Sequence, residues 1–212
     1  MSEISMYPSN PGLIGEQPCL IFANTVGGSR PATEREYLHD YTDLLAWSQH
    51  AGLITASEAQ RLLAEATHRS LEAARVFERA ILLRETIYRI FSAVAAGGAP
   101  ETADLGILNE ALAEVLTKLQ VTPTETGFTW SWRSEPEALD GMLWPVVRSA
   151  GELLTSAELQ RVRECAGDTC SWLFIDTSRN HSRRWCDMND CGNRAKARRH
   201  YARSRTRNTE KA

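Results

Sequence analysis

The 212-residue sequence has 24 Lys and Arg, 27 Asp and Glu, and 42% hydrophobic residues, a composition typical of a globular protein rather than a disordered or fibrous one. None of its apolar runs approaches the roughly 18–20 residues that a helix needs to cross a bilayer, so no membrane partner is expected. The amino terminus is polar, acidic and proline-containing, unlike a secretory signal. We therefore expect a protein of the reducing cytoplasm.

Charge divides the chain unevenly. Residues 1–160 hold 11 Lys and Arg against 21 Asp and Glu, a net charge of −10, while residues 161–212 hold 13 against 6, a net charge of +7. Such asymmetry is typical of a protein in which only one end meets a polyanion. We predict two parts, a mostly helical regulatory domain over 1–155 and a zinc finger with a basic carboxy-terminal helix over 156–212.

The chain begins with one predicted strand and one predicted helix. The apolar stretch Cys19–Val26, which two glycines follow, predicts a short buried strand that ends in a turn. Thr33 and Glu36 have the spacing of a capping box, which predicts a helix over 34–50 that Gly52 ends.

Two helical segments come next. Thr55 and Glu58 repeat the capping signature, and the helical pattern continues to about Ala96. Because this segment is longer than a usual globular helix, we expect a break within 67–70. Residues 101–117 form a further amphipathic helix.

A change of period follows that helix. Alternating residues from Leu119 to Trp132 predict a hairpin, and a row of its aromatic side chains is expected to pack in the core rather than line a pocket: Phe128, Trp130 and Trp132. A helix over 136–150 is predicted next, with a kink at Pro145. The fold class is therefore mainly α with a small β-sheet (α+β), followed by a small treble-clef-like zinc finger.

The cysteines provide the clearest sign of chemistry. Cys19 stands alone and is expected to be a small buried hydrophobe. The other four form two Cys-x4-Cys pairs separated by fifteen residues: Cys165, Cys170, Cys186 and Cys191. Four thiolates at such spacing suit one structural Zn²⁺, and they leave no open position for catalysis. Two disulfides or four unrelated thiols are the alternatives, which the expected compartment disfavours.

The residues between the pairs predict a small hairpin. Residues 172–175 form a strand that is expected to pair with 183–185 across a turn at Asn180. A knuckle, a hairpin and a helix that starts at the second ligand pair resemble the treble-clef order. We expect three aromatic side chains to shield the thiolates from water: Trp172, Phe174 and Trp185.

The basic end predicts a nucleic-acid-binding helix. From Cys191 onward there are eight Lys or Arg and one acidic residue, and helical spacing leaves little apolar stripe. We expect DNA contacts from Arg183, Arg184, Arg194, Lys196, Arg198, Arg199, Arg203 and Arg205. Arg183 and Arg184 can instead donate to sulfur and backbone, and the whole segment can be a solvated tail. RNA and anionic lipid stay open as targets.

The segment from Cys165 to Arg203 closely resembles the CGNR-type zinc finger, through its Cys191–Arg194 signature and the stretches Asp176–Ser178 and Arg184–Cys186. The region around Asn24–Val26 resembles the ABATE domain of stress-induced transcription regulators, which precedes this finger. The resemblance implies zinc ligation by the four paired cysteines and DNA binding in bacterial transcriptional control.

No catalytic motif of the hydrolase, nucleotide-binding or metalloprotease kind occurs in the sequence, so an enzyme is not expected. The hypothesis is a two-part transcription regulator, in which the amino-terminal domain senses a small-molecule effector or forms a homodimer. The rival hypothesis is a protein-interaction module, in which the finger docks an acidic partner.

Overall fold

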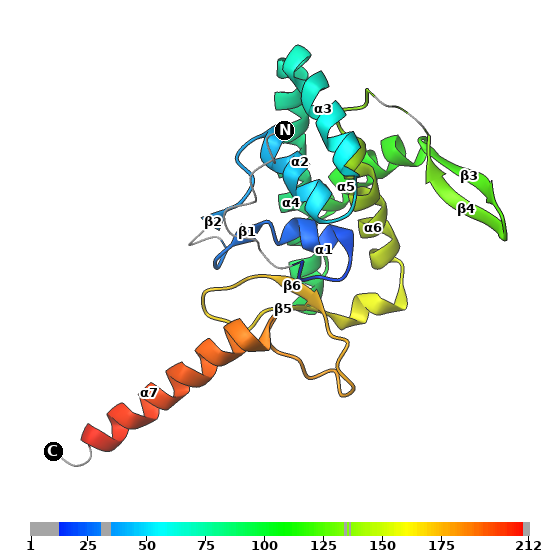
Figure 1. The fold of residues 1–212 in the computed structure, drawn as a ribbon. Coiled ribbons are helices and arrows are strands. Elements are labelled where there is room, and N and C mark those ends of the chain that lie inside the picture. The colour runs from blue at the N-terminus through cyan, green and yellow to red at the C-terminus, as the bar shows by residue number, and fades with distance from the viewer. Residues whose placement is uncertain (1–12, 31–34, 134, 136, 210–212) are drawn as a thin grey trace.

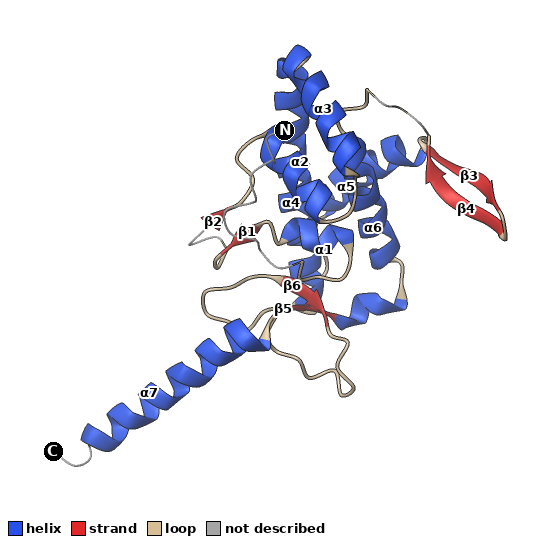
Figure 2. Ribbon diagram, in the orientation of Figure 1, coloured by secondary structure: helices blue, strands red, loops and turns tan. Residues whose placement is uncertain are grey.

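The computed structural model describes residues 13–30, 35–133, 135 and 137–209, with the backbone alone for 202–209. Helices form most of this chain, and its strands form three separate two-stranded antiparallel ribbons (Figure 2). The predicted fold class, mainly helical with small sheets and a cysteine-rich carboxy-terminal part, is confirmed. Within the described ranges, no helix has both the length and the apolar character needed to span a membrane.

The order of the elements is shown in Figure 1. Along the chain they are α1 (Pro18–Ala23), β1 (Val26–Gly27), β2 (Arg35–Glu36), α2 (Tyr41–His50), α3 (Ala56–His68), α4 (Ser70–Ala95), α5 (Thr102–Leu116), β3 (Leu119–Thr124), β4 (Gly127–Trp132), η1 (Gly141–Leu143), α6 (Trp144–Leu154), η2 (Ala157–Arg161), β5 (Val162–Glu164), β6 (Leu173–Ile175), η3 (Met188–Gly192) and α7 (Asn193–Thr209).

The long helix α4 is the scaffold of the body, and it contacts α1, α2, α3, α5 and β5. Its core-facing side is buried from Ala73 to Phe91. Only Arg69 separates α4 from α3, and its φ of −121° and ψ of 45° break the helix where the sequence predicts a break. The predicted capping box of α3 is also confirmed: Thr55 Oγ1 accepts a hydrogen bond from the Glu58 N–H, and the Glu58 carboxylate accepts one from the Thr55 N–H.

The first apolar segment is a helix, so the predicted strand over Cys19–Val26 is wrong. Pro18 occupies the first turn of α1, where its fixed φ favours a helix and its missing N–H costs nothing. Cys19, Leu20 and Phe22 are all fully buried between α4 and α6, and a segment buried on all sides has no periodicity that separates helix from strand. Only Val26–Gly27 is extended.

The next helix starts later than predicted. Thr33 lies outside the described residues, and Glu36 belongs to β2 instead of a capping box. The Glu36 carboxylate accepts hydrogen bonds from the N–H groups of Tyr37 and Leu38, which holds this segment extended. The actual N-cap of α2 is Asp40, whose side chain accepts from the Asp43 N–H.

The last helix of the body is also displaced. The predicted helix over 136–150 is instead α6, which spans Trp144–Leu154 after the single turn η1. Pro145 lies in the first turn of α6 and does not kink it, because a proline there replaces an N–H that has no partner within the helix.

The predicted hairpin forms as β3 and β4, but its aromatic row does not pack in the core as expected. Phe128 and Trp130 are exposed, although the Arg148 guanidinium of α6 lies 5.8 Å from the Trp130 ring centroid. Trp132 packs against the body, with its ring 5.8 Å from that of Trp144. The hairpin extends sideways from α5 and α6 (Figure 1), and none of the described helices buries its outer half. The expectation fails because the alternation predicts which side chains share a face, and not whether another element covers that face.

The capping box predicts a loss of stability on substitution. In Thr55→Ala, the first turn of α3 loses one side-chain acceptor and the reciprocal contact with Glu58, so the free energy of unfolding should fall by about 1 kcal/mol. Equilibrium urea unfolding followed by circular dichroism measures this change. Thr42→Ala, at an exposed position in the first turn of α2, is the control and should change stability by less than about 0.5 kcal/mol.

Candidate metal centre and its basic helix

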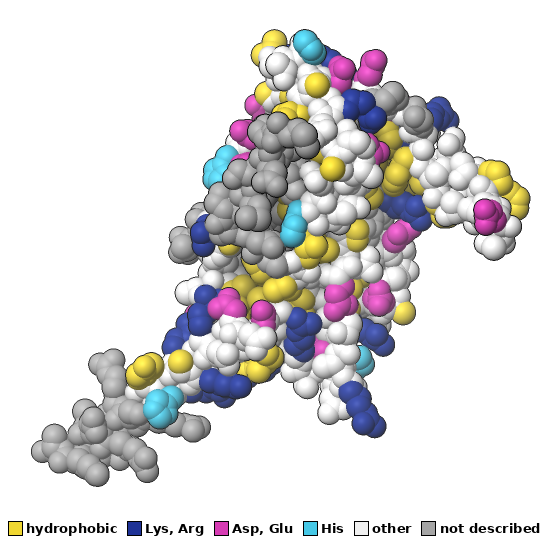
Figure 3. Space-filling view, viewed as in Figure 1, with side chains coloured by type: hydrophobic (Ala, Val, Ile, Leu, Met, Phe, Trp, Pro, Cys, Tyr) yellow, Lys and Arg dark blue, Asp and Glu magenta, His cyan; other side chains and the backbone are white. Residues whose placement is uncertain are grey.

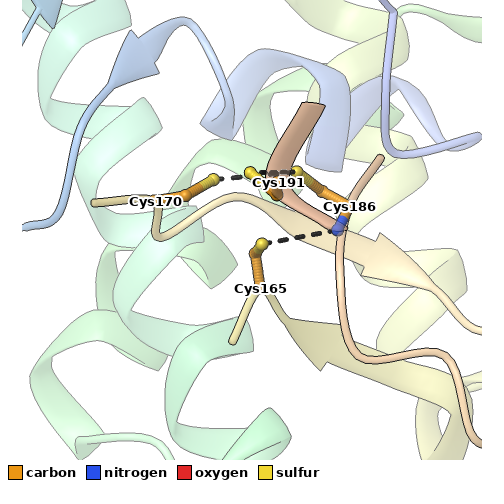
Figure 4. A group of neighbouring side chains, drawn as sticks. All are labelled: Cys165, Cys170, Cys186 and Cys191. Atoms are coloured by element: carbon orange, nitrogen blue, oxygen red, sulfur yellow. Dashed lines mark hydrogen bonds between the residues drawn. The ribbon is translucent and has the colours of Figure 1, made fainter. Parts of the chain in front are cut away.

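Four cysteine side chains converge beside β5, β6 and the start of α7 (Figure 4). Their Sγ atoms lie within 4.8 Å of one another, and Cys186 Sγ is 3.7 Å from the Sγ atoms of Cys170 and Cys191. A tetrahedral zinc with bonds of about 2.3 Å holds its sulfurs about 3.8 Å apart, whereas a disulfide bond is about 2.05 Å long. All four cysteines are free and buried, so the donor set fits one tetrahedral metal ion.

The first cysteine pair lies on a tight turn between two strands. The Cys165 N–H donates to the Trp172 carbonyl at 2.9 Å, and the Cys170 N–H donates to the Gly167 carbonyl at 3.0 Å. These bonds fold the four intervening residues back, so that both sulfurs face the same point.

The strand after this turn pairs with a different partner from the one predicted. β6 pairs with β5, in the register Val162↔Ile175 and Glu164↔Leu173, so the predicted pairing with 183–185 is wrong. The buried Asp176 carboxylate explains the difference, because it accepts hydrogen bonds from the N–H groups of Ser178 and Arg183. These bonds hold the following segment as a loop.

The second cysteine pair leads directly into the last helix. Asp187 is the N-cap of the single π-helical turn η3, and its side chain accepts from the Asn189 N–H at 2.7 Å. Cys191 lies in that turn, and α7 begins at Asn193. The metal centre therefore fixes the first turn of the basic helix, as the treble-clef order predicts.

The crowded thiols shift one another's pKa values. Hydrogen bonds from the Cys170 and Cys186 thiols lower the pKa of Cys165 to about 2. The contact with Cys165, together with burial, raises the pKa of Cys170 to about 12 and raises the pKa of Cys186 as well. A divalent cation supplies the positive charge that a full set of thiolate ligands in this volume requires.

Two family models match the chain and agree with this arrangement. The model named ABATE, described as "Putative stress-induced transcription regulator", matches residues 16–157, which is more than half of the chain. This chain belongs to the ABATE family. The model of the CGNR zinc finger matches residues 161–204, so both parts of the predicted resemblance are confirmed. No match was found among curated proteins.

The CGNR finger and its four clustered cysteines indicate one structural zinc ion as the cofactor. The aromatic side chains around the cysteines are where the sequence predicts them: Phe174 is buried against the sulfurs, and Trp172 and Trp185 pack beside it. They exclude water from the sulfurs and give this small segment a core of its own.

The cysteine cluster predicts how zinc content responds to substitution. Cys170→Ser and Cys191→Ser each remove one thiolate, so elemental analysis of the purified protein should show far less than the one zinc per chain of the parent. Cys19→Ala is the matched control, because Cys19 is buried between α4 and α6 away from the cluster, and it should keep one zinc per chain. Full zinc content in both serine variants would contradict the assignment of these ligands.

Two of the arginines predicted to contact nucleic acid lie in the loop before the second cysteine pair. Arg183 donates from Nε to the Trp185 carbonyl at 3.0 Å and from Nη2 to the Cys186 carbonyl, and its guanidinium stacks 4.6 Å from the Phe174 ring centroid. Its side chain therefore supports the metal loop, which was the alternative to a phosphate contact. Arg184 is exposed and stacks beside the Trp185 ring.

The first arginines of α7 point back toward the finger. Arg194 donates to the Cys191 sulfur at 3.0 Å and pairs with Asp190 at 3.2 Å. Arg198 reaches across to Asp168, between the first two cysteines, at 2.7 Å. These contacts offset the negative charge of the thiolates and fasten the helix to both cysteine loops.

The remaining basic residues of α7 lie farther from the metal centre or on other sides of the helix. Lys196 and Arg199 are exposed, and within the described part of the chain no ion pair engages them. Arg203 and Arg205 lie on the outer half of α7. The structure thus separates Arg194 and Arg198, which hold the helix in place, from Lys196 and Arg199, which face solvent.

Hydrogen bonds join the finger to the ABATE domain, a feature the sequence reasoning missed. The Asn24 side chain donates to the Leu173 carbonyl and accepts from the Leu173 N–H, both at 2.8 Å, so it pairs with β6 as a neighbouring strand would. The partner strand β5 is also bonded to the body, because the Glu164 carboxylate accepts hydrogen bonds from Tyr88 Oη at 3.2 Å and from Ser92 Oγ at 2.5 Å, both on α4.

These contacts also bear on the division of the chain. Val162, Leu173 and Ile175 belong to the same buried core as α1, α4 and α6. The finger is thus packed against the body and is not suspended on a linker, and the predicted division after residue 155 stays a prediction.

A buried ionic cluster lies next to this junction. Arg84 is almost fully buried and pairs with both oxygens of Glu36 at 2.7 Å and with Glu85 at 2.9 Å. Arg30 also pairs with Glu85, and its guanidinium lies 4.0 Å from the Tyr88 ring centroid. These residues border a cavity of about 440 Å³. No sequence signal pointed to this cluster, because Glu36 and Arg84 are far apart in the chain.

The cluster predicts a loss of stability in acid. Burial alone raises the pKa of Glu36, but the hydrogen bonds and charge of Arg84 outweigh burial and lower this pKa below its ordinary value of 4.5. A carboxylate with a lowered pKa stabilises the fold above its unfolded pKa, and this contribution is lost as the pH falls through the folded value. The free energy of unfolding should therefore decrease as the pH falls below about 4.5.

Glu36→Gln tests this assignment. The variant should lose about 1–3 kcal/mol at neutral pH, because Arg84 keeps a buried positive charge with a weaker partner. It should also show a shallower decrease in acid, measured by urea unfolding across a pH series. Glu78→Gln, at an exposed position of α4, is the control. An unchanged pH dependence in Glu36→Gln would contradict the role of this carboxylate.

Proposed function

We propose that this protein is a DNA-binding transcription regulator whose CGNR finger presents α7 to the phosphate backbone. The observation that carries the proposal is the way α7 is held. The helix begins two residues after Cys191, directly beside the cysteine cluster, and the rest of it projects away from the body (Figure 1). A flexible basic tail would lose conformational entropy on binding, whereas a helix anchored at one end is already ordered.

The charge of α7 supports an anionic partner. Its 17 residues include seven Lys or Arg and no Asp or Glu. These positive charges repel one another, and α7 has no acidic residue of its own to offset the repulsion. Counterions or phosphates must therefore balance the charge. The acidic body carries a charge of −10 over residues 1–160 and would be repelled by DNA, which favours an approach through α7 alone.

The two groups of basic residues have different roles in this proposal. Arg194 and Arg198 fix the direction of the helix through Cys191 and Asp168. Lys196 and Arg199 face solvent and are the side chains best placed to contact phosphate.

Substitution of the exposed pair tests the proposal. The double variant Lys196→Gln with Arg199→Gln should weaken binding to random duplex DNA and lower the slope of log affinity against log salt by up to about 1.8, because two phosphate contacts are lost. Fluorescence anisotropy at several salt concentrations measures both quantities. Zinc content should stay at one per chain, since neither residue contacts the cysteines.

The control removes equal charge from the body. Arg75→Gln with Arg79→Gln changes two exposed arginines of α4 and should leave affinity and salt slope unchanged. An equal loss in both double variants would mean that total charge, and not α7, governs binding. No duplex binding by the parent protein at low salt would overturn the proposal and favour an acidic protein partner for the finger.

We propose a sensing and non-catalytic role for the ABATE domain. The cavity beside Arg84 supports this role, because Arg30 and Tyr88, which line it, also form hydrogen bonds with residues next to the first cysteine pair. The Arg30 N–H donates to Ser171, which follows Cys170, and Tyr88 bonds Glu164, which precedes Cys165. A small effector that moved Arg30 or Tyr88 would thus act on residues adjacent to two zinc ligands.

A further inference from the structure

The β3–β4 hairpin has one apolar face and one polar face. Its register pairs Leu119 with Trp132, Val121 with Trp130, and Pro123 with Phe128, which places all six on one side. The other side carries uncharged polar residues and glycine: Gln120, Thr122, Thr124, Gly127, Thr129 and Ser131. In a ribbon with this pattern, the apolar side is typically buried against another element or another chain.

The outer half of the apolar face is uncovered within the described part of the chain. Phe128 is 79% exposed, Trp130 is 56% exposed and Val121 is 55% exposed. Figure 3 shows hydrophobic side chains gathered at the far end of the projecting hairpin. A two-stranded ribbon is marginally stable alone, and a contiguous exposed apolar patch is typical of an interaction site.

The two edges of the hairpin differ in their capacity to accept another strand. Pro123 has no N–H, so Pro123↔Phe128 is a non-hydrogen-bonded pair, and the alternation of an antiparallel ladder extends this to Val121↔Trp130 and Leu119↔Trp132. The backbone groups of these residues therefore point outward, toward the edges. Pro123 interrupts the donors along β3, whereas Phe128, Trp130 and Trp132 present an unbroken row along β4.

We propose that β4 pairs antiparallel with β4 of a second copy of this chain, which forms a four-stranded sheet in the order β3-β4-β4-β3. An antiparallel pair of identical strands has a twofold axis, so one strand can be its own partner in a closed dimer. With outward-facing backbone groups at 128, 130 and 132, the symmetric register sets Trp130 opposite the partner's Trp130, and Phe128 opposite the partner's Trp132. The aromatic side chains of both copies then lie on the same face.

Charge favours a second copy as the occupant of this edge. Residues 1–160 carry a net charge of −10, so two bodies repel each other over most of their surface. The strands 119–124 and 127–132 carry no charged residue, and Glu125 in the turn is the only one in the hairpin. The strands themselves thus add no charge repulsion between two copies, and the Arg148 guanidinium of α6, 5.8 Å from the Trp130 ring centroid, is a cation beside the centre of the pairing.

The area is consistent with a reversible dimer. Aromatic side chains bury roughly 150–250 Å² each, so the exposed parts of Phe128 and Trp130 with the strand edge reach only the lower end of specific interfaces. A dimer of this kind would dissociate on dilution. It would also bring two basic helices into one particle, a consequence that rests on the proposed function.

Charge substitution at the centre of the pairing tests the proposal. The parent should sediment as a concentration-dependent dimer in analytical ultracentrifugation, while Trp130→Glu and Trp130→Lys, each placing like charges face to face, should be monomeric at the same concentration. An equimolar mixture of the two variants should recover the dimer, because position 130 then faces an opposite charge. Thr124→Lys, on the polar face of β3, is the control and should dimerise like the parent.

The outcomes separate this proposal from the proposed function. A parent protein that stays monomeric at high micromolar concentration, or two monomeric variants that do not associate when mixed, would overturn the pairing of β4. Circular dichroism and zinc content equal to those of the parent establish that the variants are folded. The measurement contains no DNA, so a dimer without duplex binding would leave the hairpin proposal intact and refute only the proposed function.

Discussion

The requirement that four sulfur atoms meet at the corners of one tetrahedron governs the carboxy-terminal part of this protein. The finger segment is too short to bury an adequate core unaided, so metal binding, the aromatic side chains around the cysteines and the packing of β5 and β6 against the body hold it together. Because Cys191 lies in the turn that becomes α7, the same requirement fixes where the basic helix starts. Arg194 and Arg198 then couple its direction to the charge of the thiolates and to the first cysteine loop.

The ABATE domain and the finger form a continuous structure joined by directional bonds. Asn24 completes the edge of β6, while Tyr88 and Ser92 hold Glu164 of β5, so both strands that lead to the first cysteine pair are held by the body. These bonds have specific geometry, and a small shift of α1 or α4 would change them. Under the proposed sensing role, this junction would connect the cavity beside Arg84 to the metal loops.

Buried and exposed charges have separate roles in the molecule. Inside the body, Arg84 is compensated by Glu36 and Glu85, an arrangement that favours one packing of β2 against α4. On the finger, the arginines nearest the metal are occupied by carbonyl, sulfur or carboxylate partners. Lys196 and Arg199 are exposed cations on α7, which projects away from the body (Figure 1).

The sequence by itself determined the features that depend on residues within a turn or two of one another. The Cys-x4-Cys pairs, the Thr55–Glu58 capping box, the break at Arg69 and the alternation of the β3–β4 hairpin are of this kind, and each was predicted. The tertiary structure alone decided the features that depend on distant partners. Packing of Pro18–Ala23 between α4 and α6 fixed a helix where the apolar run could not separate helix from strand. The Arg84 guanidinium binds the Glu36 carboxylate in β2, and β5 took the pairing with β6 that was expected of 183–185. Local patterns could not predict these outcomes, because the contacts that stabilise them join residues tens of positions apart and form only when the chain is folded.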